Sequence, residues 1–255
     1  MKVKKILVSQ PKPSTEKSPY FELAEKFGVE MVFRPFIKVE GLSAKEFRAV
    51  NPKVSIPEHT AIIFTARTAI DHFFRICEEM RIHMPDTQKY FCTSETIANY
   101  LQKYIVYRKR KVFFGNTGKI ADLLPCMVKH KSEKYLIPLS DVHNDDVKIM
   151  LDAKKLNHTE CVMYRTVSND FTAEEVKDFD YDMLVFFSPS GIDSLMKNFP
   201  DFATSHKDVA IATFGPATAK AAKEAGLRLD LEAPTEKYPS MTGALQHYLI
   251  VNGDD

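Results

Sequence analysis

The feature that most constrains the fold is an internal repeat. When the sequence is shifted so that residue 64 falls on residue 186, "FTARTAID" (64–71) lies on "FFSPSGID" (186–193), and "TSETIA" (93–98) lies on "GPATAK" (215–220). A second, slightly longer shift places Ser9 on Ser140 and Arg34 on Arg165. Because two separate segments share one offset, the sequence predicts two similar lobes with equivalent strand ends.

Short apolar runs alternate with helical patterns along the whole chain. The runs "KILVSQ", "AIIF", "YFCTS", "LVFF" and "VAIATF" precede helices expected over 20–27, 68–80, 97–104, 191–198 and 217–226. Repeated strand–turn–helix units are typical of parallel sheets covered by helices. The expected fold class is therefore α/β, with two similar parallel-sheet α/β lobes, a two-stranded connector that joins them and a cleft between them.

Two arginine-bearing segments mark the expected connection between the lobes. They are "VFRPFIKV" (32–39) and "CVMYRTV" (161–167). Pro35 has no N–H to donate to a sheet, so its strand is an edge or a connector. We expect a first lobe of residues 1–36 plus 166–255, a second lobe of residues 41–160, and hinge strands over 32–40 and 160–167.

The charge balance excludes some classes of partner. The net charge is +1 in 255 residues, so no overall field draws the chain to nucleic acid or to an anionic membrane. The basic run "KYIVYRKRK" (103–111) is interpreted as a solvated edge strand. No apolar run approaches the ~20 residues of a membrane span, and the N-terminal run is too short for a signal peptide. The four cysteines show no CxxC spacing, which favours reduced thiols and a cytoplasmic protein.

Small polar residues and glycines recur where a strand or loop meets the start of a helix. In parallel sheets the carboxyl ends of the strands form the ligand-binding edge, and helix N-termini there favour anions. Each position also reads as a helix N-cap, worth about 1 kcal/mol. As a set they predict a site for carboxylates. The candidate binding residues are Thr65, Thr68, Ser94, Thr96, Asn116, Thr117, Ser188, Ser190, Gly191, Gly215, Thr218 and Ser240.

Other kinds of site are not supported by the motifs. "GNTGKI" (115–120) lacks the spacing of a phosphate loop, and no GxGxxG follows a strand. The eight histidines show no metal-binding spacing, so no metal site is predicted. Ser188 does not lie in a GxSxG motif. An enzyme with this sequence is expected to act mainly by orienting a reactive substrate.

Several segments together resemble the uroporphyrinogen-III synthase family. "VFFSPSGIDSL", "IATFGPATAKAAKEAG" and "APTEKYPSMTGALQHYL" are similar to its C-terminal half. "IIFTARTAIDHF", "TSETIANYL" and "CVMYRTV" resemble its other segments in the same order. The chain departs from the family pattern at Ala66 and Arg67, which replace a Ser-Pro-like pair, and at Thr93, which replaces a glycine.

The resemblance implies a reaction and its residues. Family members close hydroxymethylbilane, a linear tetrapyrrole with eight carboxylates, to uroporphyrinogen III, with loss of water and inversion of ring D in haem biosynthesis. The resemblance implies no cofactor. We also expect a cytoplasmic monomer that receives its substrate by transient hand-over from hydroxymethylbilane synthase. Tyr164 matches a candidate proton donor for the departing hydroxyl, and Thr218 matches a carboxylate contact. Weaker nominations for charge balance are Arg34, Arg165, Lys220 and Lys237.

Two alternatives remain open from the sequence. The first is a two-lobed protein that binds or senses a tetrapyrrole or a small anion without catalytic activity. The second is a sugar-nucleotide transferase with twin lobes, which should carry acidic ligands at its strand ends. The sequence offers no such acidic ligands.

Overall fold

The computed structural model describes residues 3–252. The chain forms two compact α/β units. The first unit consists of Met1–Lys38 and Val167–Asp255, and the second of Val39–Thr166. Each unit contains a mostly parallel sheet, which confirms the predicted α/β class. The chain passes from one unit to the other twice.

The first unit is a five-stranded sheet in the order β11-β10-β9-β1-β2. Every neighbouring pair is parallel. Its strands are β1 (Lys5–Val8), β2 (Glu30–Phe33), β9 (Met183–Phe186), β10 (Ala210–Phe214) and β11 (Leu229–Ala233). Its helices are α1 (Pro19–Phe27), α7 (Ala173–Lys177), α8 (Pro189–Asn198), α9 (Phe202–Ser205), α10 (Pro216–Glu224) and α11 (Met241–Val251).

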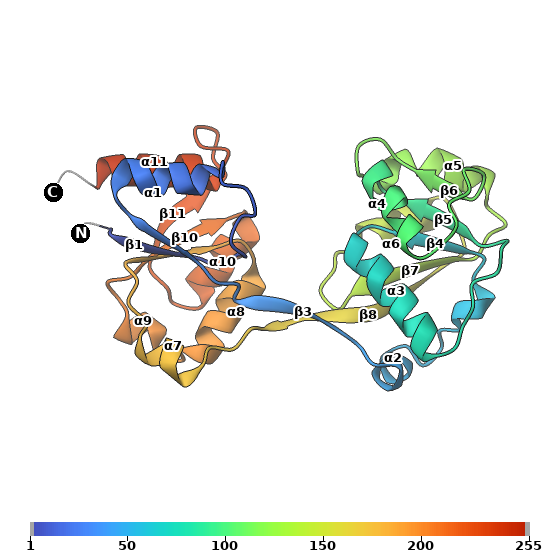
Figure 1. Ribbon diagram of the computed structural model, residues 1–255, viewed down its shortest axis with the longest axis horizontal. Helices are drawn as coiled ribbons and strands as arrows, with labels where there is room; N and C mark the ends of the chain where they lie inside the picture. The colour runs from blue at the N-terminus through green and yellow to red at the C-terminus, as the bar shows by residue number, and fades with distance from the viewer. Residues whose placement is uncertain (1–2, 253–255) are drawn as a thin grey trace. The chain divides into compact units, whose positions relative to one another are not determined.

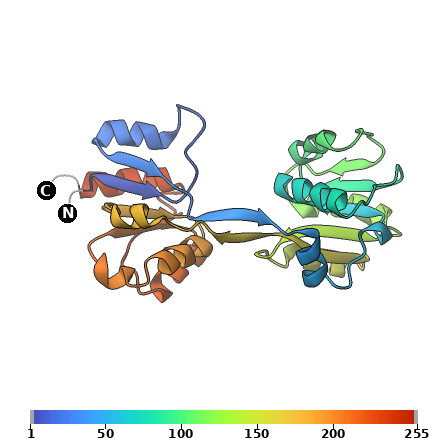
Figure 2. The same cartoon turned by 60° about the horizontal axis from the view of Figure 1, so that its bottom comes forward.

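The second unit holds a six-stranded sheet in the order β3-β8-β7-β4-β5-β6. Its strands are β3 (Ile37–Gly41), β4 (Ala61–Phe64), β5 (Lys89–Cys92), β6 (Val112–Phe114), β7 (Tyr135–Ser140) and β8 (His158–Ser168). Its helices are α2 (Ala44–Val50), α3 (Arg67–Glu79), α4 (Glu95–Tyr100), α5 (Leu124–Lys129) and α6 (Asp146–Ala153), with 3-10 turns η1 (Ile56–Glu58), η2 (Leu101–Lys103) and η3 (Ile120–Asp122). β3 and β8 lie side by side in both views of the chain (Figures 1 and 2).

The predicted repeat is present in the two sheets. The first offset places β4 on β9 and β5 on β10, and the second places β1 within β7 and β2 within β8. The strand order follows the same correspondence, because β10-β9-β1-β2 matches β5-β4-β7-β8. The repeat therefore describes a shared topology, and equivalent strand ends supply equivalent loops.

The core of each unit follows from the alternation of side chains along fully buried strands. In the first unit Ile6 and Val8 pack with α1 and α11, whereas Leu7 packs on the opposite face with α8 and α10 (Figure 1). In the second unit Ile62 packs with α3 and α4, and Ile63 packs with α5 and α6. Helices thus cover both faces of each sheet, and the strand ends carry the exposed loops.

Two expectations from the sequence differ from the structure. The basic run 103–111 is not an edge strand: η2 ends at Lys103, turns follow, and β6 begins only at Val112. Ile105 packs against the core there, and the N–H groups of Lys111 and Val112 both donate to the carbonyl of Arg108 in a turn. Residues 32–40, expected as one strand, are divided between the end of β2 and β3, with Pro35 between them.

Among residues 3–252, none of the helices is both long and apolar enough to cross a membrane.

Candidate functional site

The carboxyl ends of the first unit's strands gather six of the candidate residues. Val185 of β9 lies beside both Val8 and Ala212, so the loops that follow β9 and β10 leave the sheet at the same edge. Ser240 follows β11 and is the N-cap of α11, which packs on β11. We call this set the first-unit rim: Ser188, Ser190, Gly191, Gly215, Thr218 and Ser240.

The N-cap interpretation holds for three serines. The Ser188 hydroxyl accepts a hydrogen bond from the Gly191 N–H at 3.2 Å, and Ser240 accepts one from Gly243 at 3.1 Å. In the second unit Ser94 accepts from Ile97 at 3.4 Å. One cap satisfies one of the unpaired N–H groups in the first turn of a helix. The remaining N–H groups of these turns are the donors that a carboxylate would use.

Gly215 gives the start of α10 an unusual backbone. Its φ is 93° and its ψ is 145°, a region that side-chain-bearing residues rarely adopt. Its N–H donates to the Ala233 carbonyl at 2.6 Å, and Pro216 follows. Thr218 lies in the first turn and is only 2% exposed, and its hydroxyl forms no hydrogen bond within residues 3–252. The turn therefore combines bare backbone at Gly215 with a nearly buried Thr218 whose hydroxyl the described residues do not engage.

Replacing Gly215 by alanine is expected to lower the free energy of unfolding by about 1–3 kcal/mol, because alanine is strained in this region of φ and ψ. Free space surrounds the position, so crowding adds nothing to the loss. Urea denaturation would measure it. Gly243→Ala in α11 is the control for backbone conformation, since that glycine has an ordinary helical backbone and its added Cβ would meet only the Ser240 hydroxyl, at 3.1 Å. Equal stability of Gly215→Ala and the unmodified protein would contradict the strain.

The corresponding edge of the second unit gathers the other six candidates. β4, β5 and β6 are parallel neighbours, and the loops after them lie at one edge of the sheet. We call this set the second-unit rim: Thr65, Thr68, Ser94, Thr96, Asn116 and Thr117.

The loop after β6 binds a carboxylate of the chain itself. One Asp122 carboxylate oxygen accepts from the Asn116 N–H at 3.1 Å, the Thr117 N–H at 2.7 Å and the Thr117 hydroxyl at 2.6 Å. These hydrogen bonds, led by that of the hydroxyl, lower the pKa of Asp122. Gly115 is required at this point, because a Cβ there would lie 2.9 Å from the Asp122 Cβ. The loop thus has the geometry of a carboxylate receptor, and its donors are already engaged.

The departures from the family pattern have local consequences. Ala66 is the N-cap of α3 and offers no side-chain oxygen, so this helix starts without a side-chain cap. Thr93 is 5% exposed, and its N–H donates to the Phe64 carbonyl at 3.1 Å. Thr93 therefore serves the packing between β4 and β5 rather than the surface of the rim.

Tyr164 lies in β8 and packs into the core of the second unit. It is 8% exposed, and its ring stacks on His72 of α3 with the centroids 5.1 Å apart. Burial raises the pKa of Tyr164 and lowers the pKa of His72. The Tyr164 hydroxyl has no hydrogen-bond partner between residues 3 and 252, yet it is not fully shielded from solvent. The free hydroxyl can donate a hydrogen bond or a proton, and the raised pKa makes it a weak acid.

Three of the four nominated cations are engaged in ion pairs. Arg165 binds Glu40 and Glu46, and Lys220 lies 3.7 Å from Glu224 on the same helix. Lys237 lies over the Tyr238 ring and forms no ion pair within the described part of the chain.

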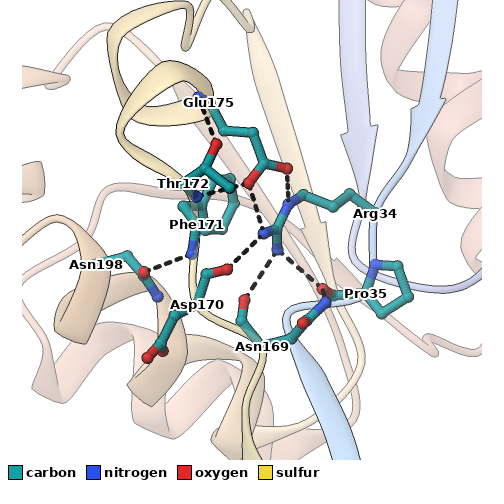
Figure 3. A network of polar contacts seen from close by, with 8 residues as sticks. All are labelled: Arg34, Pro35, Asn169, Asp170, Phe171, Thr172, Glu175 and Asn198. Carbon is teal, nitrogen blue, oxygen red and sulfur yellow. Dashed lines mark hydrogen bonds and ion pairs between the residues drawn. The ribbon is translucent and has the colours of Figure 1, made fainter.

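Arg34 is the centre of a dense polar network in the first unit (Figure 3). Its guanidinium donates to both carboxylate oxygens of Glu175, at 2.7 and 3.0 Å. It also donates to the carbonyls of Pro35, Asn169 and Asp170, each at 3.0 Å. With all these donors engaged, Arg34 holds the chain after β2 against the segment that leads to α7. Its role is structural rather than ligand binding.

One group of potential metal ligands could not be recognised from a sequence motif. His143, Asp145 and Glu160 each place one ligand atom within 4.8 Å of the others. Glu160 comes from β8 and the other two from the loop after β7, so no short motif joins them. His143 and Asp145 are exposed and Glu160 is half-buried, and exposed acidic groups are common without an ion. The absence of a metal site stays a prediction.

The comparisons with known proteins identify the family. The family model for "Uroporphyrinogen-III synthase HemD" matches residues 18–243. No curated protein sequence matches the chain. The crystal structure of uroporphyrinogen-III synthetase from Helicobacter pylori is 14% identical, with a TM-score of 0.59, and the alignment covers 98% of this chain and 100% of that one. A mutant uroporphyrinogen III synthase from Thermus thermophilus is 15% identical, with a TM-score of 0.49 and coverage of 99% and 100%. The chain belongs to the uroporphyrinogen-III synthase family, whose members are cyclising lyases of tetrapyrrole biosynthesis.

Proposed function

We propose that this chain closes hydroxymethylbilane to uroporphyrinogen III. The observation that carries the proposal is the family match over residues 18–243. The two rims, which offer helix N-termini and small residues at strand ends, support it. A substrate with eight carboxylates has enough arms to occupy several such helix N-termini.

In this proposal the rims hold acetate and propionate arms through main-chain N–H groups that the chain leaves free, which excludes those of Asn116 and Thr117 because Asp122 engages them. Ser188, Ser190 and Gly191 contribute the start of α8, and Gly215 and Thr218 contribute the start of α10. The partial positive charge of a helix N-terminus favours each bound carboxylate. Ser188 is a cap and a donor site in this scheme, not a nucleophile.

Catalysis would then come mainly from orientation. The free substrate closes by itself to the type I isomer, so the protein must direct ring D to attack through its substituted carbon. Holding two reacting groups in a productive geometry is worth about 7–11 kcal/mol of the barrier. In this scheme Tyr164 donates a proton to the departing hydroxyl, and no cofactor takes part.

An isomer assay tests this function. Hydroxymethylbilane is supplied fresh by hydroxymethylbilane synthase, and the oxidised products are separated by chromatography. We expect the type III isomer in excess. Product of type I alone, with the substrate bound but not redirected, would instead identify a tetrapyrrole-binding protein without catalytic activity.

Thr218→Val is expected to slow the formation of the type III isomer. Valine has nearly the shape of the buried threonine but lacks the hydroxyl, the group proposed to touch a carboxylate. Because one hydrogen bond to a charged group contributes about 1.5–3 kcal/mol, we expect about a tenfold or greater rise in KM. Steady-state kinetics in the isomer assay measure it. Unchanged turnover and KM would remove Thr218 from the site.

We also propose that the chain acts as a cytoplasmic monomer that receives its substrate by transient contact with hydroxymethylbilane synthase. The net charge of +1 is near neutral, which fits a protein that does not bind to a charged surface. Sedimentation of the protein alone, and with that synthase during turnover, would test both statements. A stable dimer would contradict the monomer.

A further inference from the structure

A cavity of about 920 Å³ lies wholly within the second unit. It is bounded by α3, by the loop over 81–88 and by the segment over 103–112. Gln88 and Lys111 precede β5 and β6, so the cavity borders the amino ends of these strands. The rim residues follow the carboxyl ends, and none of them lines the cavity. It is therefore a different site from the one proposed above.

The walls suit a flat apolar group. Phe74 and Tyr104 stack with their ring centroids 4.6 Å apart and their planes 7° from parallel. Ile82 and Met84 add aliphatic surface beside them. The volume falls in the range of about 300–1,000 Å³ that small-molecule sites occupy, and such sites combine apolar walls with a few polar groups.

The charges around the cavity are unbalanced toward the positive. Five lysine and arginine side chains line it against three carboxylates. Lys103 pairs with Asp71 at 3.0 Å, and the Arg108 guanidinium lies 3.8 Å from Asp86. Arg81 forms no ion pair within residues 3–252, and the same holds for Lys111. These two cations are available to an anionic group.

Arg81 is held in a conformation that normally selects glycine. Its φ is 57°, it follows Met80, the C-cap of α3, and the Ile82 N–H after it donates to the Cys77 carbonyl at 2.8 Å. A residue in the left-handed region at the end of a helix is usually glycine, because any Cβ is strained there. The chain keeps an arginine at this position, with its side chain on the cavity wall.

Gln88 adds an unmet hydrogen-bonding group. It lines the cavity, is 3% exposed, and its side-chain Nε2 has no hydrogen-bond partner within the described residues. A buried amide N–H without an acceptor is unfavourable, and an acceptor oxygen on a ligand would satisfy it.

We propose that this cavity binds a small aromatic organic anion. Its ring lies against Phe74 and Tyr104, and its acid group pairs with Arg81 in the field of Lys111. The aromatic stack supplies the apolar contact, and the unpaired cations select the anion over a neutral molecule of the same shape. The proposal does not depend on the reaction at the rims.

Two dyes that share one ring system test it. The probes are 8-anilinonaphthalene-1-sulfonate, an aromatic anion, and N-phenyl-1-naphthylamine, its neutral analogue. Fluorescence titration of the full chain is expected to show one saturable site for the anion and weaker binding of the neutral dye. Arg81→Gly should weaken the anion about tenfold, since it removes a charged partner, and should leave the neutral dye unchanged.

The chain offers a matched control. Lys155 also has a left-handed backbone, with φ 53°, at the end of α6, and it does not line the cavity. Both Arg81→Gly and Lys155→Gly relieve backbone strain and should keep or raise the melting temperature. Only Arg81→Gly should weaken the anion. Wild-type affinity in Arg81→Gly, equal weakening in Lys155→Gly, or non-saturating binding of the anion would each overturn the proposal.

Discussion

Tyr164→Phe is expected to lower the rate of type III isomer formation by about 10–100-fold, at or below the lower end of the range for acid–base groups. Burial raises the pKa of Tyr164 above its ordinary value of 10.0, which keeps the phenol protonated but makes it a weaker acid, so its expected effect lies at the low end of that range. The ring and its stacking on His72 remain in phenylalanine. The loss should therefore appear in kcat, with little change in stability.

The matched control for this experiment is Tyr90→Phe. Tyr90 of β5 lies in the same core cluster as Tyr164, burial raises its pKa as well, and it is not a residue of either rim. Its variant should retain wild-type kcat in the isomer assay. If Tyr164→Phe also retains it, Tyr164 is a packing residue of β8; if the rate falls together with the melting temperature, the loss is structural.

Arg34→Ala is expected to lower the free energy of unfolding by about 2–3 kcal/mol, because it leaves partly buried acceptors without donors. The Arg34 side chain is 16% exposed and its guanidinium lies 3.5 Å from the centre of the Phe171 ring, so packing is lost as well. Chemical denaturation would measure the difference. Lys197→Ala is the control: Lys197 pairs with Asp170 at 2.7 Å on an exposed surface, where an ion pair contributes about 0–1 kcal/mol.

The same network gives a pH dependence. Hydrogen bonds from Arg34, and to a lesser extent from the Thr172 N–H, lower the pKa of Glu175 from 4.5 to about 2. A depressed carboxyl pKa contributes stability that is complete above the unfolded value and is lost as the pH falls toward the folded one. The difference in stability between the unmodified protein and Arg34→Ala should therefore be constant above about pH 5 and shrink between 4.5 and 2. A difference that does not change with pH would contradict this account.

The regular elements of this protein are visible in its sequence, and several functional contacts are not. Apolar runs such as 61–64 and 183–186 are buried on both faces, so their composition alone predicts a parallel strand. The run 103–111 misled because β-branched and aromatic residues favour a strand, whereas packing of Ile105 and the turn at Arg108 decide the conformation.

Side chains that meet through tertiary structure carry no local signal. The engagement of Thr117 by Asp122 and the approach of Glu160 to His143 both depend on how loops fold back on the sheet. The left-handed backbone of Arg81 could not be predicted from the sequence either, because this conformation favours glycine rather than arginine. The sequence therefore predicts which residues form the rims, but not which of their hydrogen-bond donors are already engaged within the chain.

The two passages of the chain between the units impose an order on synthesis. β1 is paired with β2 on one side and with β9 on the other, and β9 is made only after every residue of the second unit. The complete 39–166 unit therefore emerges from the ribosome while the first sheet still consists of two strands. Since domains generally fold as units during translation, the inserted half matures first, and the flanking half must keep an unfinished apolar edge soluble until its last strands emerge.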